Sequence, residues 1–530
     1  MPRLSSADRT VSPPVIEVPD DYNAAHDLIE RNLQAGRAGK VAFIDDAGRY
    51  TYGELAGRVN RFATGLRRLG VRAEERVMLC LLDTLDFPVA FLGCIKAGIV
   101  PVAANTLLTP SDYEYMLRDS GATAVVVSAA LLPQFAAIPG RVASLARVVV
   151  SGGDAGVHIP FDQVLADGDP EFEPADTRAD AVCFWMYSSG STGAPKGTVH
   201  VHGSLIRIAE YYARPILGIR EDDVVFSAAK LFFAYGLGNA MVFPMAVGAT
   251  AVLMAERPTP ASVALRLRTH QPTIFCAVPT LYASMLVSPD LPSRTELRLR
   301  VATSAGEALP PEIGRRVSEH FGIDVLDGIG STEMLHIFLS NRPGDVRFGT
   351  TGKPVPGYEL RLVDEAGNPV PDGEQGELQI SGETSALCYW NNRARSRSTF
   401  LGTWTRSGDK YLRDPDGYYV YCGRSDDMLK VSGIYVSPVE VEAALITHPA
   451  VLEAAVIGRA DADELIKPKA FVVLKPGHAP SEELADALKR HVKSTLAPYK
   501  YPRWIEFVAD LPKTATGKIQ RFRLRARDTA

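Results

Sequence analysis

A strand that leads directly into a loop of glycine and hydroxyl residues, over residues 181–202, limits most strongly what this chain can fold into. The segment reads AVCFWMYSSGSTGAPKGTVHVH. Its apolar run from Ala181 to Tyr187 predicts a buried strand, and GTVHVH predicts a second strand. The glycines let backbone N–H groups turn toward one point, where the hydroxyls and Lys196 add further donors. We therefore expect a concave cluster of donors that suits a polyphosphate.

This loop differs from the Walker A phosphate loop, GxxxxGK[ST]. Lys196 follows Pro195 rather than a glycine, and the strand that comes next provides no helix N-terminus for a phosphate. A surface hairpin rich in turn residues is the alternative, which the closing Pro-Lys-Gly disfavours. His200 and His202 follow closely, but without a third ligand we expect them to be strand residues rather than a metal site.

Length and composition exclude several classes of protein. A chain of 530 residues suggests at least two domains, and 46% hydrophobic with 22% charged residues is ordinary for a soluble globular protein. The net charge of −5 argues against a general electrostatic attraction to nucleic acid or anionic lipid. We see neither a signal peptide nor the roughly 18 apolar residues of a membrane span. We expect a cytoplasmic protein with its six cysteines reduced.

Alternating strand and helix patterns predict the fold class. Short β-rich segments such as TAVVVS alternate with helical ones such as PSDYEYMLRD, which favours an α/β fold with largely parallel sheets. The clearest helix begins at Thr51, which forms a capping box with Glu54, and ends at Gly70. We expect a large N-terminal domain of layered α/β sheets.

Changes in composition and residue pattern along the chain predict its domains. Residues 1–20 look like a flexible N-terminal arm, and residues 21–425 form the large domain. Within it, glycines and prolines punctuate strand-like pieces from about 346 to 425, which predicts a β-rich subdomain. Residues 427–530 then form a small α+β C-terminal domain, with the boundary at Asp426.

Several motifs together indicate a family. SSGSTGAPKG resembles the phosphate loop of the adenylate-forming superfamily, which contains acyl-CoA synthetases, peptide-synthetase adenylation domains and firefly-type luciferases. TSAGEALP, LDGIGSTE, TRSGDKY, GRSDD and LPKTATGKIQR follow in the order of that superfamily. FFAYGLGN and GSTEMLHIF are similar to bacterial benzoate–CoA ligases, and the similarity runs from about residue 20 to about residue 525.

The resemblance implies a nucleotide site for ATP and Mg²⁺. The phosphate loop would comprise Ser188, Ser189, Gly190, Ser191, Thr192, Gly193 and Lys196. Adenine, ribose and the α-phosphate would contact Gly306, Glu307, Asp327, Gly328, Ile329, Thr332, Asp409 and Arg424. Ile329 stands where many relatives carry an aromatic residue, so we expect apolar contact with adenine without ring stacking. Glu333 would bind Mg²⁺ through carboxylate oxygen.

The same resemblance implies a mobile C-terminal domain and two half-reactions. Lys518 would be the catalytic lysine, because carboxylate attack on the α-phosphorus gathers negative charge that an ammonium stabilises. The small domain would then rotate about Asp426 as a hinge. That rotation would replace Lys518 by Gly433, past which the pantetheine arm of coenzyme A would run.

The segment KLFFAYGLGN suggests the acid. Phe232, Phe233 and Tyr235 would shorten a pocket, and the glycines that follow would open a flat slot for a planar ring. Packing of these rings in the core is the alternative. By the resemblance, the aryl-acid pocket comprises Ala234, Tyr235, Gly236, His336 and Ile337.

Four functions remain open at this stage. The first is a benzoate–CoA ligase, and the second is a ligase for a 4-hydroxy- or aminobenzoate or a heteroaromatic acid. The third is an enzyme that loads an aryl acid onto a separate carrier protein; the chain ends 12 residues after Lys518, so we expect coenzyme A instead. The fourth is a non-catalytic nucleotide-binding regulator, which the presence of Lys518, Glu333 and Asp409 disfavours. Neither nucleic acid nor a membrane is an expected partner.

Overall fold

Two mostly parallel sheets form the body of the protein. The computed structural model describes residues 2–190, 193–425, 427–431, 434–461, 465–496, 500–513 and 519–528. In these residues, the first sheet has the strand order β21 (Cys388–Tyr389), β11 (Gly193–Val201), β10 (Val182–Gly190), β6 (Val100–Ala103), β5 (Arg76–Cys80), β7 (Ala124–Ser128), β8 (Arg147–Ser151), β9 (Ile159–Pro160). Its first three strands pair antiparallel with one another, and the others are parallel.

The second sheet is also mostly parallel. Its order is β18 (Lys353–Pro354), β17 (Ile337–Ser340), β16 (Asp324–Gly330), β15 (Val301–Ser304), β14 (Ile274–Ala277), β12 (Val224–Ser227), β13 (Thr250–Val252), β3 (Val41–Ile44), β4 (Arg49–Thr51). The strands from β16 to β3 are parallel, whereas both ends of the sheet turn antiparallel. Runs such as Ile274–Ala277 are buried throughout, as expected of parallel strands with both faces covered.

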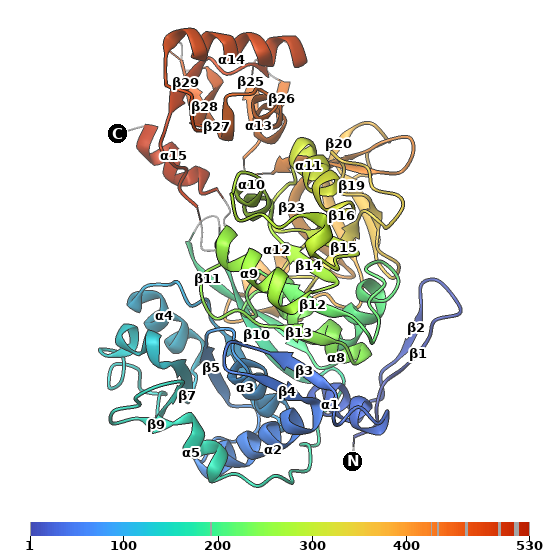
Figure 1. Cartoon of the computed structure of the whole chain (residues 1–530), viewed down its shortest axis with the longest axis vertical. Coiled ribbons are helices and arrows are strands. Elements are labelled where there is room, and N and C mark those ends of the chain that lie inside the picture. Colours follow the sequence, from blue (N-terminus) through green and yellow to red (C-terminus); the bar gives the residue numbers. More distant parts are fainter. Residues whose placement is uncertain are drawn as a thin grey trace.

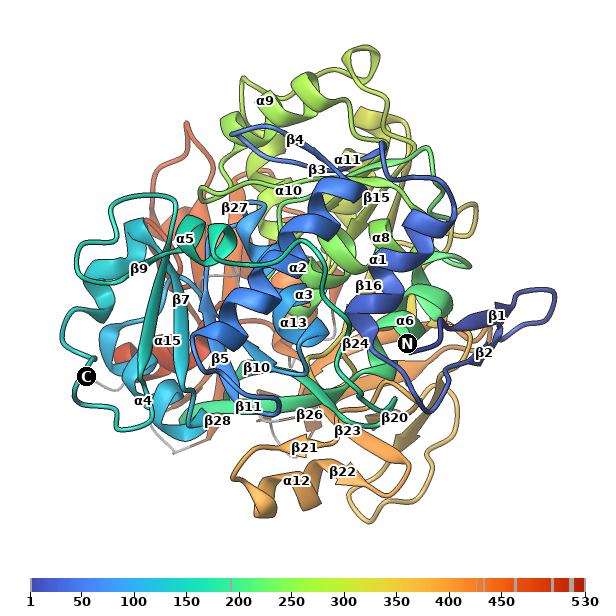
Figure 2. The same ribbon diagram turned by 90° about the horizontal axis from the view of Figure 1, so that it is seen from below.

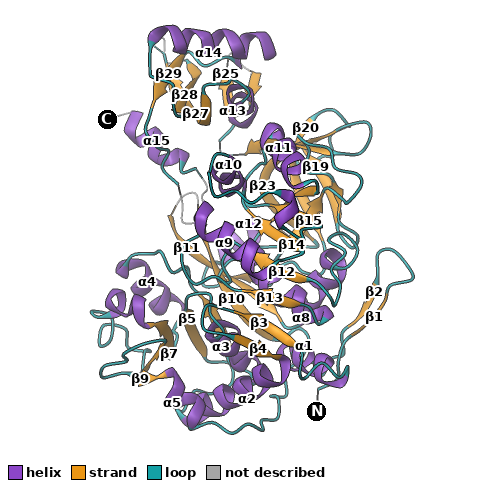
Figure 3. Cartoon of the chain, viewed as in Figure 1, coloured by secondary structure: helices purple, strands orange, loops and turns teal. Residues whose placement is uncertain are grey.

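Helices lie between and around the sheets (Figure 1, Figure 3). The α-helices of this part are α1 (Ala24–Gln34), α2 (Tyr52–Arg68), α3 (Asp86–Lys96), α4 (Pro110–Ser120), α5 (Phe161–Ala166), α6 (Gly203–Ile208), α7 (Ala234–Leu237), α8 (Phe243–Val247), α9 (Pro260–His270), α10 (Pro279–Leu286), α11 (Pro311–Phe321), α12 (Arg393–Thr399). Helix α3 packs on β5 and β6 while α2 and α8 pack on β3, β4 and β13, so this layer joins the two sheets (Figure 2).

Shorter helices complete this region. Two 3₁₀ segments, η1 (Ala129–Phe135) and η4 (Arg294–Glu296), lie near the surface, and two π-helical turns are η2 (Ala209–Ala213) and η3 (Gly238–Val242). The capping box predicted for α2 is confirmed: Glu54 N–H donates to Thr51 Oγ1 at 3.2 Å, and Thr51 N–H donates to Glu54 Oε2 at 2.7 Å.

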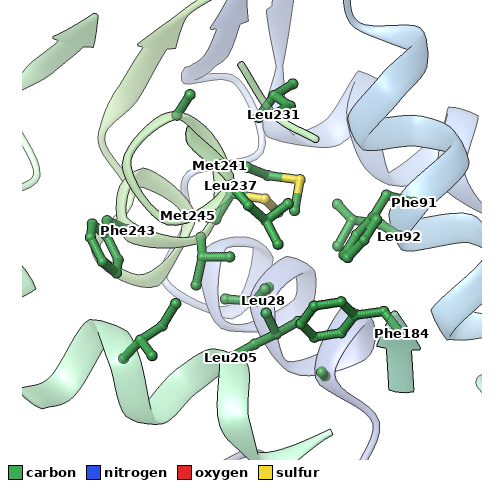
Figure 4. Close-up of a cluster of buried hydrophobic side chains, with 14 of the residues drawn as sticks. Leu28, Phe91, Leu92, Phe184, Leu205, Leu231, Leu237, Met241, Phe243 and Met245 are labelled. Carbon is green, nitrogen blue, oxygen red and sulfur yellow. The ribbon is translucent and has the colours of Figure 1, made fainter. Parts of the chain in front are cut away.

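The core between the sheets is made from helices distant in sequence. Figure 4 shows side chains converging from α1, α3, α6, β10 and the segment from Leu231 to the end of α8: Leu28, Phe91, Leu92, Phe184, Leu205, Leu231, Leu237, Met241, Phe243 and Met245. All are buried, and burial of such a side chain contributes about 1.5–3 kcal/mol. Packing in the core therefore fixes the position of the segment 231–245.

A third sheet and a small terminal unit complete the chain. The third sheet has the order β19 (Glu359–Val363), β20 (Gln375–Ser381), β23 (Trp404–Arg413), β22 (Phe400–Leu401), and β24 (Tyr419–Arg424) also pairs with β23. The terminal unit holds a hairpin of β25 (Leu429–Val431) and β26 (Ile434–Val436), a sheet of β27 (Val451–Ala460), β28 (Ile466–Leu474) and β29 (Trp504–Phe507), and helices α13 (Pro438–Ile446), α14 (Glu482–Thr495) and α15 (Arg521–Asp528). It has a hydrophobic core of its own.

The predicted fold class is confirmed: a large α/β domain is followed by a small α+β unit. Asp426, the predicted hinge, lies outside the described residues, between β24 of the third sheet and β25 of the terminal unit. Among the residues that the structure describes, no helix is long and apolar enough to cross a membrane.

The N-terminal segment differs from its prediction as a flexible arm. It forms a hairpin of β1 (Ser6–Asp8) and β2 (Val15–Glu17) that projects from the body (Figure 1). Arg9 follows β1 and donates two hydrogen bonds of 2.7 Å to the carboxylate of Glu210. Glu210 is buried in η2, so its charge needs a partner, and Arg9 ties the hairpin to the body. Sequence reasoning missed this pair because its members lie 201 residues apart.

Candidate active site

The predicted site segments meet at one edge of the sheets. Strands β10, β12, β15 and β16 lead at their carboxyl ends into SSGSTGAPKG, LFFAYG, AGEALP and STEMLH respectively. In open α/β sheets, ligands bind beyond the carboxyl ends of the strands. The topology thus places the four segments where a ligand is expected.

The hydroxyl-rich loop connects two antiparallel strands. Ser188 on β10 lies opposite Lys196 on β11, so the two predicted phosphate contacts share one register position. The Ser188 hydroxyl is buried and has no hydrogen-bond partner in the described part of the chain. Ser191, Thr192 and the side chain of Ser189 lie outside the described residues. Gly190 and Gly193 pair with each other at the tip.

A polar cluster forms beside this loop. Lys196 Nζ lies 3.9 Å from Glu333 Oε1, and the hydroxyl of Tyr389 donates to the same oxygen at 2.6 Å. Burial lowers the pKa of Lys196, whereas the charge of Glu333 opposes that shift. Tyr389 was not predicted as a site residue, because nothing in the string ALCYWNN indicates its distant partners.

Glu333 suits a Mg²⁺ ion that arrives with a nucleotide. Its carboxylate is partly exposed, and Mg²⁺ commonly uses one or two carboxylates together with substrate phosphates and water. No group of three or more acidic, histidine or cysteine side chains that could hold a metal occurs among the described residues.

The predicted adenine segments follow β15 and lie within β16. Gly306 has a φ of +92°, a conformation that favours glycine, and Thr280 donates to the Glu307 carboxylate at 2.7 Å. Asp327 is buried, and burial raises the pKa of its carboxyl well above the ordinary value. Its Oδ1 has no partner among the described residues, which suits an acceptor for an amino group. Ile329 packs against the core from the same strand.

Asp409 and Arg424 lie opposite each other on β23 and β24. Arg424 Nη1 donates to Asp409 Oδ1 at 3.1 Å and to the carbonyl of Ser407 at 3.0 Å. Asp409 is buried, with 7% exposure. The guanidinium of Arg424 on the neighbouring strand fixes the position of its carboxylate. The structure therefore brings the two predicted ribose contacts together.

A histidine of the phosphate-loop hairpin contacts the backbone of Thr332. His200 Nε2 and the carbonyl oxygen of Thr332 are 2.8 Å apart, and the His200 ring stacks on Phe184 with 5.2 Å between centroids. His202 Nδ1 accepts from the backbone N–H of Ala24 at 3.2 Å. Burial lowers the pKa of both histidines to about 4, so both are neutral near pH 7. His200 lies on β11, as predicted, whereas His202 follows the end of that strand.

A cluster of aromatic and apolar side chains, which we call the pocket wall because the sequence predicts the acid pocket here, lies next to these polar groups. Tyr235 from α7 shares a hydrogen bond of 2.6 Å with the Thr303 hydroxyl on β15, and Ala234 packs beside it. Ile337 begins β17 and is buried. His336 lies 5.9 Å from Tyr235, between ring centroids, so it borders the same wall.

Buried rings surround His336. Its ring centroid lies 4.5 Å from that of Phe243 and 5.3 Å from that of Tyr212. Burial lowers the pKa of His336 to about 3, so the imidazole is neutral across the working range of most enzymes. Tyr212 in η2 packs against this ring, a contact that no pattern in the sequence indicates.

The glycines of this segment differ in role from the prediction. A β-carbon on Gly236 would collide with the carbonyl oxygen of Lys230, and one on Gly238 would lie 2.6 Å from His336 Nε2. The glycines therefore allow close packing of α7 and η3 against their neighbours, rather than opening a slot. Both π-turns, η2 and η3, lie in this wall, where such turns are often found at functional sites.

Asp83 supports the pocket wall from the first sheet. It follows β5, and its two oxygens accept from the backbone N–H of Leu231 at 3.2 and 3.3 Å. Leu231 immediately precedes the segment that carries Tyr235. Burial raises the pKa of Asp83 to about 6, although Lys230 and the Leu231 N–H oppose the shift.

We predict that Asp83→Asn changes the pH dependence of stability. The folded pKa is raised above the unfolded value of 3.8, so the folded state binds the proton more tightly. Ionisation of Asp83 thus lowers the free energy of unfolding as the pH rises from 5 to 8, by about 1–2 kcal/mol. Asparagine keeps an acceptor and does not ionise. The apparent Tm of the variant relative to the natural protein should rise between these pH values.

The exposed Asp290→Asn variant is the control for this measurement, since its carboxyl lies at the surface. A Tm difference for Asp83→Asn that is the same at pH 5 and pH 8 would contradict the prediction.

Besides Ser191 and Thr192, three further predicted residues lie outside the described part of the chain: Lys518, Asp426 and Gly433. The nearest described neighbours of Lys518 are Lys513 and Ile519, which form an isolated β-bridge. Their roles stay predictions.

Comparison with known proteins agrees with this geometry. The AMP-binding enzyme family matches residues 29–390, and the AMP-binding enzyme C-terminal domain matches residues 440–518. A benzoate–CoA ligase of Thauera aromatica is 67% identical over 525 residues, which are 99% of this chain and 99% of that protein. A 4-hydroxybenzoate–CoA/benzoate–CoA ligase of Rhodopseudomonas palustris is 53% identical, over 95% of this chain and 94% of its own length.

A solved structure agrees as well. The crystal structure of a benzoate CoA ligase from Burkholderia xenovorans superimposes with a TM-score of 0.90 at 59% identity, over 95% of this chain and all of that one. The predicted resemblance is thereby confirmed, and this chain belongs to the AMP-binding enzyme family, that is, to the adenylate-forming superfamily.

Proposed function

We propose that this protein is an AMP-forming benzoate–CoA ligase. In the first half-reaction, benzoate and ATP give benzoyl-adenylate and pyrophosphate. In the second, coenzyme A displaces AMP and gives benzoyl-CoA. The observation that carries the proposal is the placement of a neutral aromatic pocket wall beside a polar cluster: strands β16 and β17 and the turn between them carry Asp327, Glu333 and His336. The named relatives support benzoate as the acid.

The pocket wall fits an unsubstituted aromatic acid. In this proposal, Tyr235, neutral His336 and Ile337 would offer rings and methyl groups to the face of a planar ring. The carboxylate of benzoate would then point toward Lys196 and Glu333, where the nucleotide phosphates are expected. A 4-hydroxy- or aminobenzoate, or a heteroaromatic acid, would place a polar group against this wall and would need a partner there.

The residues at the phosphate end have separate tasks in this proposal. The benzoate oxygen attacks the α-phosphorus, and the bond from that phosphorus to the bridging oxygen of pyrophosphate breaks. Lys196 and the loop hydroxyls hold the phosphates, Thr332 contacts the α-phosphate, and Lys518 stabilises the charge that develops between the two fragments. Mg²⁺ bound by Glu333 would neutralise charge on the phosphate oxygens.

The second half-reaction needs a different arrangement of the terminal unit. We assign the hinge to Asp426 and passage of the pantetheine arm to Gly433. The sulfur of coenzyme A attacks the carbonyl carbon of benzoyl-adenylate, the bond from that carbon to the phosphate oxygen breaks, and AMP leaves while the thiol proton passes to solvent. Rotation would withdraw Lys518 when its charge is no longer needed.

One assay tests the proposal against its alternatives. Purified protein is given ATP, Mg²⁺ and benzoate, or a substituted or heteroaromatic acid, with and without coenzyme A. We expect pyrophosphate and benzoyl-CoA, with the highest kcat/KM for benzoate. Pyrophosphate without any aryl-CoA would indicate carrier loading, absence of pyrophosphate would indicate a regulator, and a higher kcat/KM for another acid would replace benzoate.

We predict that Lys518→Ala separates the half-reactions. Adenylation should fall by about 10²–10³-fold, the scale for loss of one group that stabilises transition-state charge. Conversion of supplied benzoyl-adenylate to benzoyl-CoA should stay within about twofold, because that step gathers no charge at the α-phosphate. Single-turnover assays of each step measure both. Lys489→Ala, which removes a surface lysine paired with Asp486, is the control. Equal losses in both steps would refute the role.

We predict that Gly238→Ala impairs the acid site selectively. The new β-carbon would press on His336 and lie 3.0 Å from Phe243, and neither buried ring has space to retreat. The KM for benzoate should rise at least about tenfold, which corresponds to ~1.4 kcal/mol of lost binding. The KM for ATP should change little.

The matched control is Gly57→Ala in α2, where a β-carbon meets no atom within 4 Å. Equal increases of the two KM values in Gly238→Ala would show that the wall around His336 does not belong to the acid site.

A further inference from the structure

Tyr389 joins three parts of the site through one phenol ring. It ends β21, lies opposite Thr198 on β11, and is 3% exposed. Its hydroxyl donates to Glu333 Oε1 at 2.6 Å. Its ring faces Lys196, whose Nζ lies 4.5 Å from the ring centroid and 3.5 Å from the hydroxyl oxygen. One side chain therefore contacts both the predicted metal ligand and the predicted phosphate-binding cation.

The segment 384–390 holds the same loop by its backbone. Ala386 N–H donates to the carbonyl of Glu333 at 2.7 Å, and the Thr384 hydroxyl donates to the carbonyl of Met334 at 2.9 Å. At the other end, Trp390 N–H donates to the carbonyl of Gly197 at 2.7 Å. The segment thus fixes the main chain on both sides, and the phenol fixes the two charged side chains between them.

The ring position is itself well determined. Tyr389 N–H donates to Ser396 Oγ at 2.9 Å, and the ring packs against Phe400 with 5.2 Å between centroids. Burial, followed by the charge of Glu333, raises the pKa of Tyr389 far above its usual value.

The phenol of Tyr389 contacts Glu333 and Lys196 in different ways. A hydrogen bond commits Glu333 Oε1 to Tyr389, while Oε2 has no hydrogen bond to any residue that the structure describes. One oxygen thus stays available for a cation. The ammonium of Lys196 gains the negative face of the ring, an interaction that is strongest where water is largely excluded. Among the contacts of the described residues, loss of this ring would leave the mutual attraction of Lys196 and Glu333 across 3.9 Å.

We propose that Tyr389 is a positioning residue of the nucleotide site, whose hydroxyl orients Glu333 for the cation and whose ring holds Lys196 for the phosphates. The proposal rests on the function given above, in which Glu333 takes Mg²⁺ and Lys196 binds phosphate. It assigns the two contacts to two separable parts of one side chain. Removal of the hydroxyl and removal of the ring must therefore have different effects.

Two variants separate these contacts, and nucleotide binding measures them without catalysis. The dissociation constant of ATP is determined by titration calorimetry, once with Mg²⁺ and once with EDTA. In Tyr389→Phe, which keeps the ring, the Mg²⁺-dependent gain in affinity should fall about tenfold, the scale of one hydrogen bond to a charged group. Affinity for metal-free ATP should stay within about twofold. In Tyr389→Leu, affinity for metal-free ATP should also fall, by about threefold to tenfold.

Tyr358→Phe provides the matched control. Its hydroxyl is buried, makes a hydrogen bond of 2.8 Å to Thr384 Oγ1 in the same segment, and contacts neither Glu333 nor Lys196. We expect both dissociation constants of this variant to stay within about twofold of the natural protein, since a neutral hydrogen bond away from the ligand is lost. Thermal denaturation of all variants shows whether they remain folded.

The outcomes are distinct. A Tyr389→Phe variant with an unchanged Mg²⁺-dependent gain overturns the proposal, and so does an equal loss of affinity with and without Mg²⁺, because that pattern indicates general packing. Failure of the natural protein to make benzoyl-CoA would contradict the proposed function, whereas the binding measurements would still decide the role of Tyr389.

Discussion

Close pairing of β16 with β17 is the constraint on which the rest of the site depends. A β-carbon on Gly328 would lie 3.1 Å from Ile337, and one on Gly330 would lie 2.5 Å from the carbonyl oxygen of His336. The two strands can approach only because both positions are glycine. As a result, the turn that carries Thr332 and Glu333 begins and ends next to His336 and Ile337, which in the proposed function would bring the acid and the nucleotide within reach of each other.

The neighbouring elements give this turn its rigidity. Each of the three sheets is connected to it: β16 and β17 belong to the second sheet, His200 reaches it from the first, and the chain leaving β20 of the third sheet donates to it from Thr384 and Ala386. A catalytic geometry needs side chains fixed to within about half an ångström, which requires such surrounding hydrogen bonds. Precision here comes from the convergence of elements that are distant in sequence.

Features set by neighbouring residues could be predicted from the sequence. The Thr51–Glu54 cap, the strand before the phosphate loop, the α/β alternation and the motif order all depend on local spacing. The hairpin at the N-terminus, the role of the Gly236 segment, Asp83 and Tyr389 could not be predicted. Tyr389 lies 56 residues from Glu333, and Asp83 lies 148 residues from Leu231. Such contacts are decided by tertiary packing, and β21, with two residues, leaves no periodic pattern.

The two π-turns of the pocket wall have a consequence for how this protein can change its substrate. In η2, Arg214 N–H bonds to the carbonyl of Ala209, and in η3, Phe243 N–H bonds to that of Gly238, so each turn accommodates one residue more than an α-helix. Loss of a single residue there would remove the wide turn and restore the α-helical repeat. In the proposed function, a one-codon deletion in either turn would therefore change the packing around His336, which both turns contact, without replacement of Tyr235 or His336.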